Sequence, residues 1–150
     1  MKKFDTIITK KNRFEVNSML VIKPITDKNE QLDICLKCGM QFDGNLFAYK
    51  AHNDGELLGC AQFDILTDHA RIDSMRQVTG SAEDFEGMFI LGRAVLNFHD
   101  LCGVRTAVYY PEEGFESRVA RSIGFKEENG VLTAHLEGMF DAKCEGHCNE

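Results

Sequence analysis

The sequence predicts an α+β domain, and three patterns lead to that fold class. Residues 46–78 contain strand-like runs separated by short polar turns, which is typical of an antiparallel meander. Residues 87–102 change to apolar side chains at spacings of three and four, the period of an amphipathic helix. Asn129-Gly130 lies between two further runs and is a strong signal for a two-residue hairpin turn. A chain of 150 residues, 43% of them hydrophobic, is long enough for one such domain.

The chain starts with a charged segment, followed by a strand and a helix. Residues 1–18 are weakly patterned, and we expect a loosely attached N-terminal arm or an extra edge strand there. Residues 19–22 are all apolar and Pro24 stops the run, which predicts a strand. Asp27, with Glu30 three positions later, predicts the start of a helix. The apolar face of this helix would hold Leu32, Cys35, Leu36 and Gly39.

Three antiparallel strands are predicted next. Residues 46–51 and 57–63 flank an Asn-Asp-Gly turn at residues 53–55, whose residue types tolerate a left-handed backbone. A polar turn at residues 67–69 leads to a third strand at residues 70–78. Strict alternation would place one set of its side chains on the same face of the sheet: Arg71, Asp73, Met75 and Gln77. The opposite face would hold Ala70, Ile72, Ser74, Arg76 and Val78.

A long helix and a short strand follow the meander. The apolar stripe of the helix consists of Met88, Leu91, Val95, Phe98 and Cys102. Gly103 ends the helix, because glycine readily takes the left-handed conformation of a helix C-terminus. Residues 104–110 are typical of a strand, which Pro111 ends because proline has no N–H group for a sheet.

The chain closes with a short helix and a hairpin. One face of the helix is marked by Phe115, Val119 and Ile123. Gly124 stands where a left-handed capping residue belongs, and Phe125 just beyond it can fold back on the helix end. Strands at residues 125–128 and 131–137 would then form the hairpin around Asn129-Gly130.

The charge and the hydropathy of the sequence exclude two classes of binding partner. The formal net charge is −7 and the isoelectric point is near 5.2, so there is no basic surface for a nucleic-acid backbone. No stretch approaches the roughly 20 apolar residues of a membrane span, and residues 1–14 lack the apolar core of an export signal. We therefore expect a cytoplasmic protein, a monomer or homodimer, with neither nucleic acid nor membrane as a partner.

The order of these elements resembles the fold of the GCN5-related N-acetyltransferases, the GNAT family. The resemblance covers residues 19–138, and its most specific part is GVRTAVYY followed by SRVARSIGFKEENGVLTAHLEG, where a core strand precedes a short helix ending in Gly-Phe. It implies a GNAT-like mixed, mainly antiparallel sheet with helices on both faces, whose only parallel pair joins residues 70–78 to residues 104–110. A GNAT-like acyltransferase domain would span residues 19–140, and residues 141–150 would form a Cys/His tail.

The resemblance also implies an acyl-CoA-dependent N-acyltransferase, which moves acetyl from its co-substrate acetyl-CoA to a primary amine. In such proteins the two parallel strands splay apart and their free backbone groups hold the pantetheine arm of CoA. Met75, Gln77 and Val78 would lie along that arm. The pyrophosphate would bind N–H groups at the start of the long helix, where the helix dipole favours an anion. Those N–H groups would belong to Gly87, Met88 and Phe89.

The loop before the long helix fits the Gln/Arg-x-x-Gly-x-Gly/Ala pattern of the family in two registers. Residues 77–82 (QVTGSA) match it literally but would start the helix several residues early. Residues 84–89 (DFEGMF) give the expected helix length, but Asp84 stands where Gln or Arg belongs, and a carboxylate repels a pyrophosphate. We favour the register of Gly87. The alternative is that Gly80 and Gly87 only form turns of a surface loop that has no role in binding.

The catalytic groups depart from the pattern of the family as well. Ala120 occupies the position, four residues before the Gly of Gly-Phe, where many members have a tyrosine that protonates the leaving thiolate. Tyr110 is our candidate for this acid and Tyr109 is the reserve, because both end the strand beside the splay. Candidate bases are Asp73 and, at neighbouring strand ends, Asp64 and Glu112. Ordinary packing or solvation is the alternative role of each residue.

Cysteines raise the question of a metal site. Cys35-x-x-Cys38 and Cys144-x-x-x-Cys148, the latter enclosing His147, have spacings that suit tetrahedral zinc. We favour free thiols and no bound metal, with a structural zinc as the alternative. Cys60 and Cys102 are expected to pack in the core. The histidines outside the tail are expected on the surface or on strands: His52, His69, His99 and His135.

Two functions from different classes follow from these patterns. The first is the acetyltransferase described above, with an unknown amine acceptor. The second is a catalytically inactive GNAT-like domain that binds CoA as a sensor or serves in interactions, which Ala120 and the imperfect loop favour. A small zinc or redox module built on the cysteines is a third and weaker hypothesis.

Overall fold

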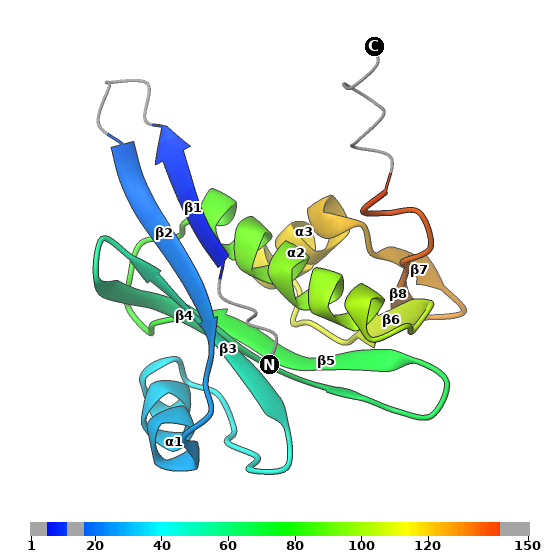
Figure 1. The fold of residues 1–150 in the computed structure, drawn as a ribbon, viewed down its shortest axis with the longest axis horizontal. Helices are drawn as coiled ribbons and strands as arrows, with labels where there is room; N and C mark the ends of the chain where they lie inside the picture. Colours follow the sequence, from blue (N-terminus) through cyan, green and yellow to red (C-terminus); the bar gives the residue numbers. More distant parts are fainter. Residues whose placement is uncertain (1–5, 12–16, 142–150) are drawn as a thin grey trace.

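The computed structural model describes residues 6–11 and 17–141, and Figure 1 shows the path of the chain. Within these residues eight strands form one sheet in the order β1-β2-β3-β4-β5-β6-β8-β7. The strands are β1 (Thr6–Lys11), β2 (Asn17–Pro24), β3 (Phe47–Asn53), β4 (Glu56–Ile65), β5 (Ala70–Gln77), β6 (Thr106–Tyr109), β7 (Lys126–Glu128) and β8 (Val131–His135). The helices are α1 (Lys28–Lys37), α2 (Phe85–Leu101) and α3 (Phe115–Ile123).

The sheet is mixed and mainly antiparallel, as the sequence predicts. Among the strands of the described residues, β5 and β6 form the only parallel pair, with Ala70 opposite Ala107 and Ile72 opposite Tyr109. Two parallel neighbours need a long crossover connection, and α2 provides it. The predicted pairing of the two strands around the long helix is therefore confirmed.

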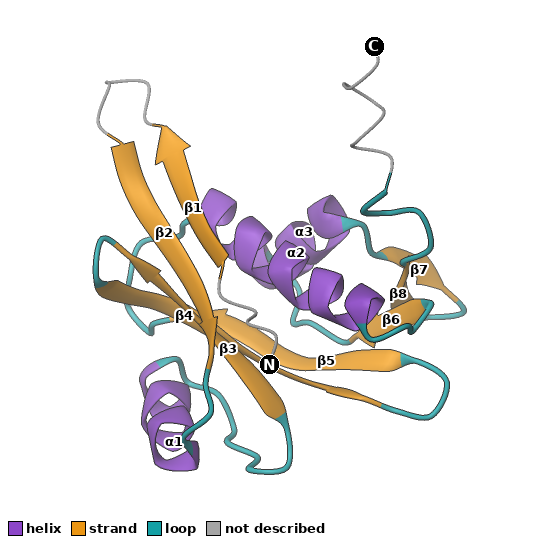
Figure 2. Ribbon diagram, viewed as in Figure 1, coloured by secondary structure: helices purple, strands orange, loops and turns teal. Residues whose placement is uncertain are grey.

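Helices cover both faces of the sheet, which confirms the predicted layers (Figure 2). α2 and α3 pack on one face, over a main core that includes Leu91, Val95 and Ile123. α1 lies against the other face, over a smaller cluster that includes Ile34 and Cys60. None of the helices in the described ranges combines the length and the apolar character needed to cross a lipid bilayer.

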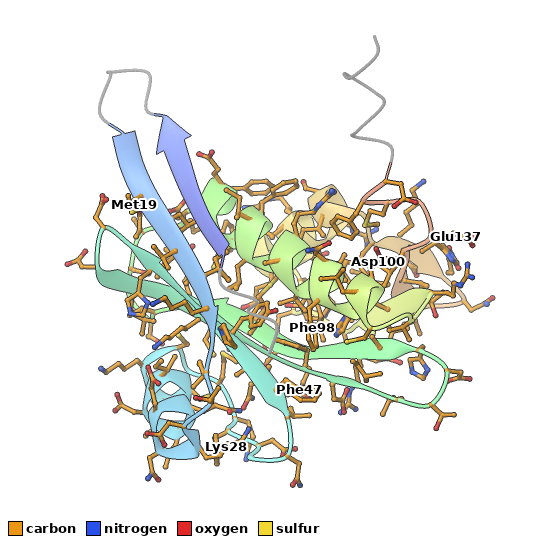
Figure 3. The ribbon with its side chains drawn as sticks, in the orientation of Figure 1. Met19, Lys28, Phe47, Phe98, Asp100 and Glu137 are labelled. Atoms are coloured by element: carbon orange, nitrogen blue, oxygen red, sulfur yellow. The ribbon has the colours of Figure 1, made fainter. Side chains whose placement is uncertain are left out.

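Aromatic side chains fill the main core between α2 and the strands β3 and β4. Phe47 of β3 and Phe98 of α2 converge in Figure 3, with ring centroids 6.0 Å apart. Phe63 of β4 lies 5.7 Å from Phe98 and 5.4 Å from His99. The expectation that His99 lies on the surface or on a strand is wrong, because it is a fully buried residue of α2.

α1 begins where the sequence predicts, but a different face is buried. Its N-cap is Asp27. Leu32 and Leu36 are 40% and 69% exposed. The buried residues of α1 are Gln31, Ile34 and Cys35. Gln31 faces inward because its Nε2 donates to Oε1 of Gln62 on β4 at 2.9 Å, so a buried polar contact decides which side of the helix meets the sheet.

A β-bulge in β5 overturns the predicted alternation of that strand. Residues 62–63 of β4 pair with Ser74 and Ile72, so Asp73 has no partner on β4. An extra residue of this kind shifts the remainder of the strand by one position and exchanges its two faces. Ile72 and Met75 consequently both face the main core, which strict alternation excludes.

The closing hairpin forms as predicted. Gly124 has a φ of 139°, a conformation that side chains rarely adopt, and it ends α3. Phe125, just beyond it, is buried in the main core. Asn129 and Gly130 have φ values of 55° and 81°, the two positive values that a type I′ turn requires.

Candidate functional site

The two parallel strands separate after three residue pairs. The register between β5 and β6 ends at Ile72 and Tyr109, while β5 continues to Gln77. Pro111 follows two residues after the end of β6 and has no N–H group to continue the ladder. We call the resulting gap, between residues 73–77 of β5 and the segment from Tyr109 to α3, the split. Among the strands that the structure describes, none pairs with residues 73–77 of β5 on this side.

Two cavities open into the split. The α2-side cavity measures about 290 Å³, and its walls include Met75, Gln77, Met88, Phe115 and Val119. The α1-side cavity measures about 200 Å³, and its walls include Gly39, Gln41, Asp73, Tyr109 and Tyr110. Four residues line both cavities: Met75, Arg76, Glu112 and Glu116. The cavities therefore meet beside β5.

An ion pair stands where the two cavities meet. Nε of Arg76 on β5 lies 2.8 Å from Oε2 of Glu116 on α3. Nη1 of Arg76 also donates to the carbonyl oxygen of Gly39, which follows α1, at 3.4 Å. Oε1 of Glu116 accepts a hydrogen bond from the N–H of Glu112 at 3.4 Å. Arg76 thus connects the two layers of helices through the split.

The start of α2 is capped by a carboxylate. Asp84 is the N-cap, and its Oδ1 accepts a hydrogen bond from the N–H of Gly87 at 2.9 Å. The N–H of Met88 donates to the carbonyl oxygen of Asp84 at 3.1 Å. Gly87 has no room for a side chain, because a Cβ there would lie 2.5 Å from Cδ2 of Leu58. A negative group therefore already occupies the end of the helix dipole that attracts anions.

The side chain of Gln77 closes the loop between β5 and α2. Its Oε1 accepts a hydrogen bond from the N–H of Asp84 at 2.7 Å. Its Nε2 donates to Oγ of Ser81 at 2.9 Å and to the carbonyl oxygen of Ala82 at 2.8 Å. One amide group thus fixes three points of the loop, and this use of Gln77 could not be read from the glycine pattern.

The predicted catalytic residues lie together in the α1-side cavity. Tyr110 is 65% exposed at its mouth, whereas Tyr109 is buried and its ring lies 5.7 Å from that of Phe125. Burial raises the pKa of the Tyr109 phenol, and the nearby Glu116 carboxylate raises it further. Asp73 is exposed and lines the same cavity.

The other candidate groups are more dispersed. Asp64 is paired with Arg71, whose Nη2 lies 3.0 Å from its Oδ2, and neither lines the two cavities. Glu112 lines both cavities. Ala120 is fully buried in the main core, so the position of the tyrosine in the family pattern is filled here by packing.

The predicted CoA-binding residues fall into two groups. Met75, Gln77 and Met88 line the α2-side cavity. Val78 packs instead in the cluster under α1, Gly87 is behind the Asp84 cap, and Phe89 packs against the main core. Sequence reasoning missed Arg76 and Glu116, because the bulge at Asp73 reverses the faces of β5 and the partner lies far along the chain.

The cysteines of the described residues are dispersed between core and surface. Cys35, Cys38 and Cys60 are buried under α1, whereas Cys102 is exposed, so the expectation that Cys102 packs in the core is wrong. In residues 6–11 and 17–141 no group of three or more His, Cys, Asp or Glu side chains is placed to hold a metal ion. Cys144, His147 and Cys148 lie outside the described residues.

Comparison with solved structures identifies the fold. The chain is similar to the ribosomal-protein-S18-alanine N-acetyltransferase from Escherichia coli, with a TM-score of 0.61 and 12% identity over 79% of this chain and 94% of that one. It is similar to an N-acetyltransferase from Staphylococcus aureus Mu50, with a TM-score of 0.61 and 11% identity over 79% and 99% of the two chains. It is also similar to a GNAT family acetyltransferase from Brucella melitensis in complex with acetyl-CoA, with a TM-score of 0.57 and 16% identity over 78% of this chain and 88% of that one.

Comparison by sequence alone finds no relative. No family model matches the chain, and no curated protein matches it in sequence. The likeness to solved structures therefore establishes that the chain has the GNAT fold.

Proposed function

We propose that the chain is an acyl-CoA-dependent N-acyltransferase, which moves acetyl from acetyl-CoA to a primary amine. The observation that carries the proposal is the split, because it joins two cavities at one point in a fold shared with N-acetyltransferases. Acyl transfer to an amine needs a place for each reactant and a junction at which their reacting atoms meet. In our proposal the thioester enters from the α2-side cavity and the amine from the α1-side cavity.

Backbone groups and apolar side chains suit the donor. Residues 74–77 of β5 pair with β4 on one side, and among the described strands they have no partner on the side of the split. The N–H and C=O groups that face the split are therefore available to the amide groups of pantetheine. Met75, Met88 and Val119 supply apolar walls for the rest of the arm. The acetyl carbonyl would then lie beside the Arg76–Glu116 pair.

The nucleotide end of the donor fits less well. A pyrophosphate at the start of α2 meets the Asp84 carboxylate, and Glu83 also lines the α2-side cavity. Like charges repel, so we expect weaker binding of CoA than an uncharged cap would allow. Gln77 keeps the loop closed, and the N–H groups of Thr79 and Ser81 already donate to the carbonyl oxygens of Lys37 and Val78. Within residues 79–83, the N–H groups of Gly80, Ala82 and Glu83 are the donors that we assign to the pyrophosphate.

The reaction moves protons at both reactants. A base takes one proton from the ammonium group, and the free amine attacks the thioester carbonyl. As the C–S bond breaks, the acid gives a proton to the thiolate, and the second proton that the nitrogen loses on becoming an amide restores the acid. Asp73 and the tyrosines line the cavity assigned to the amine. We retain Tyr110 as the acid and Tyr109 as the reserve, because the raised pKa of Tyr109 makes its phenol a weaker proton donor than an ordinary tyrosine.

Thermal unfolding with and without acetyl-CoA tests the donor site. A ligand that binds only the folded state raises the melting temperature, so acetyl-CoA should raise it and butan-1-ol should not. Release of the CoA thiol in the presence of primary amines then measures transfer. No shift at millimolar acetyl-CoA would contradict the proposal.

Substitution of Tyr110 tests the assignment of the acid. Tyr110→Phe should lower kcat by about 100-fold while the affinity for acetyl-CoA stays unchanged, as expected when only general acid catalysis is lost. Tyr109→Phe is the comparison, and a larger loss there would transfer the role to Tyr109. Unchanged turnover in both variants would remove the tyrosines from the mechanism.

A second function is favoured by Ala120 and Asp84. The first leaves no phenol at the usual position of the acid, and the second places a charge at the anion site. The missing phenol suits a catalytically inactive relative that binds CoA as a sensor, and the charge of Asp84 suits one that serves in interactions. Binding of CoA without transfer to any amine in a broad screen would favour this function over the enzyme.

A further inference from the structure

We propose that Glu116 binds the ammonium group of the acceptor, and that Arg76 occupies this place until the acceptor arrives. The proposal rests on the proposed function and adds the residue that selects a charged amine. It starts from the position of Glu116, which lines both cavities at their junction. An amine held there has entered through the α1-side cavity and faces the end of the α2-side cavity.

Glu116 is already bound to a cation. Its Oε2 lies 2.8 Å from Nε of Arg76, and its side chain is 18% exposed. The N–H of Glu112 donates to the other oxygen at 3.4 Å, which orients the carboxylate toward the split. An oriented and largely buried carboxylate forms strong charge-assisted hydrogen bonds with N–H donors. A primary ammonium group offers the same charge and the same kind of donor as the guanidinium.

Arg76 has an alternative position when it leaves the carboxylate. Its Nη1 donates to the carbonyl oxygen of Gly39 at 3.4 Å, and its side chain is 40% exposed. The guanidinium can therefore keep one partner and reach water while an ammonium group takes its place. Exchange of one cation for another leaves Glu116 paired throughout, which avoids a bare charge in a largely buried site.

This arrangement makes a prediction that a purely structural ion pair does not. Arg76→Met removes the competing cation, so the KM for an amine should fall by at least threefold. Glu116→Gln removes the charge that holds the amine, so the KM should rise by at least tenfold. A structural pair would give changes in the same direction, because either substitution breaks the same contact.

The kinetic experiment uses n-butylamine as the acceptor and acetyl-CoA as the donor. Glu86→Gln is the matched control, because it removes an equal charge from an exposed side chain in the first turn of α2. It should leave the KM for the amine within twofold of its original value. Changes of KM in the same direction for Arg76→Met and Glu116→Gln would overturn the proposal, as would no change in either.

A second measurement needs neither acetyl-CoA nor turnover. In a ¹H–¹⁵N NMR spectrum the Nε–H signal of Arg76 should move as n-butylamine is added at neutral pH, because the bond to Glu116 is exchanged. Butan-1-ol, which has the same length and no charge, should leave the signal in place. A signal that does not respond to n-butylamine would overturn the amine site even if acetyl-CoA binds. A response without binding of acetyl-CoA would support the amine site and contradict the proposed function.

Discussion

Asp84 both caps the start of α2 and sets the charge there, and that charge affects the binding of an anion. Its carboxylate satisfies the N–H of Gly87, and its own N–H is held by Gln77. Asparagine caps a helix about as well as aspartate does but carries no charge. The two tasks of Asp84, capping and setting the local charge, can therefore be separated by one substitution.

Asp84→Asn should raise the affinity for CoA about tenfold, because a negative charge a few ångströms from the pyrophosphate is removed. The unfolding free energy should change by less than about 0.5 kcal/mol, since the cap is kept. Isothermal titration with CoA measures the affinity. Asp100→Asn is the control, because Asp100 lies in α2 toward its C-terminal end (Figure 3) and should leave the affinity unchanged. Equal effects of the two substitutions would show that the pyrophosphate does not bind near Asp84.

His99 links stability to pH. It is fully buried, and in the described part of the chain neither ring nitrogen has a hydrogen-bond partner. Burial disfavours the charged ring and lowers the pKa of His99 to about 4 from 6.5. As the pH falls below 6.5, His99 therefore becomes protonated in the unfolded chain, whereas in the folded chain it becomes protonated only near pH 4.

The unfolding free energy should consequently fall as the pH drops from about 6.5 to about 4, by up to about 3 kcal/mol from this residue. The contribution is fully present above pH 6.5, the pKa of the unfolded histidine. Urea unfolding at a series of pH values measures the slope. His99→Phe should remove this part of the slope and keep an aromatic ring in the cluster. An identical slope in the variant would contradict the assignment.

At the scale of elements, the end of α3 depends on a backbone conformation that only glycine adopts easily. Gly124 has a φ of 139°, and a Cβ there would lie 3.0 Å from Cε of Met139. This one residue ends the helix and brings Phe125 into the main core. The C-terminal end of α3, a helix that forms a wall of the split, is therefore fixed by this residue.

Gly124→Ala should lower the unfolding free energy by roughly 1–3 kcal/mol, because alanine at this φ is strained. Ser122→Ala, on the exposed side of the same helix, should change it by less than about 0.5 kcal/mol. Thermal and denaturant unfolding measure both variants. A neutral Gly124→Ala would show that the end of α3 relaxes without affecting the core.

Elements also differ in how far the sequence predicts them. The hairpin at Asn129-Gly130 and the stripe of α2 depend on neighbouring residues, and both were predicted, except that Cys102 at the end of the stripe is exposed. The buried face of α1 and the bulge at Asp73 were not. Each depends on contacts with β4, through Gln62 for the helix and through the strand register for the bulge, and no local pattern contains these contacts.

At the scale of the whole molecule, the topology was predicted because the order of elements resembles that of the GNAT fold, which implies a long crossover helix between two parallel strands. Three of the candidate catalytic residues line one cavity: Tyr109 and Tyr110 at the end of β6, and Asp73 within β5. The Arg76–Glu116 pair was not predicted. Its two side chains come from β5 and α3, which are far apart along the chain, so no local pattern joins them.

The sheet separates two apolar cores, and cysteine labelling can report on one of them. Cys35, Cys38 and Cys60 all pack in the cluster under α1, whereas Cys102 is exposed. Of the four cysteines in the described residues, iodoacetamide should label Cys102 first in native conditions, and the three buried thiols should react only as α1 opens or the chain unfolds. Mass spectrometry after digestion identifies the labelled sites. Rapid labelling of Cys60 would mean that α1 leaves the sheet readily.

Only three residue pairs hold β5 to β6, and this gives the sheet a seam. On one side of it lie β1 to β5, and on the other lie β6, β8 and β7. Pulling the two parts away from each other breaks few backbone bonds, so resistance to such a force comes mainly from α2 and α3 packed across the seam. A molecule bound along the split adds bonds at the place where the ladder stops. It would therefore hold the two parts of the sheet together, and amide hydrogen exchange would slow on both sides of the seam together.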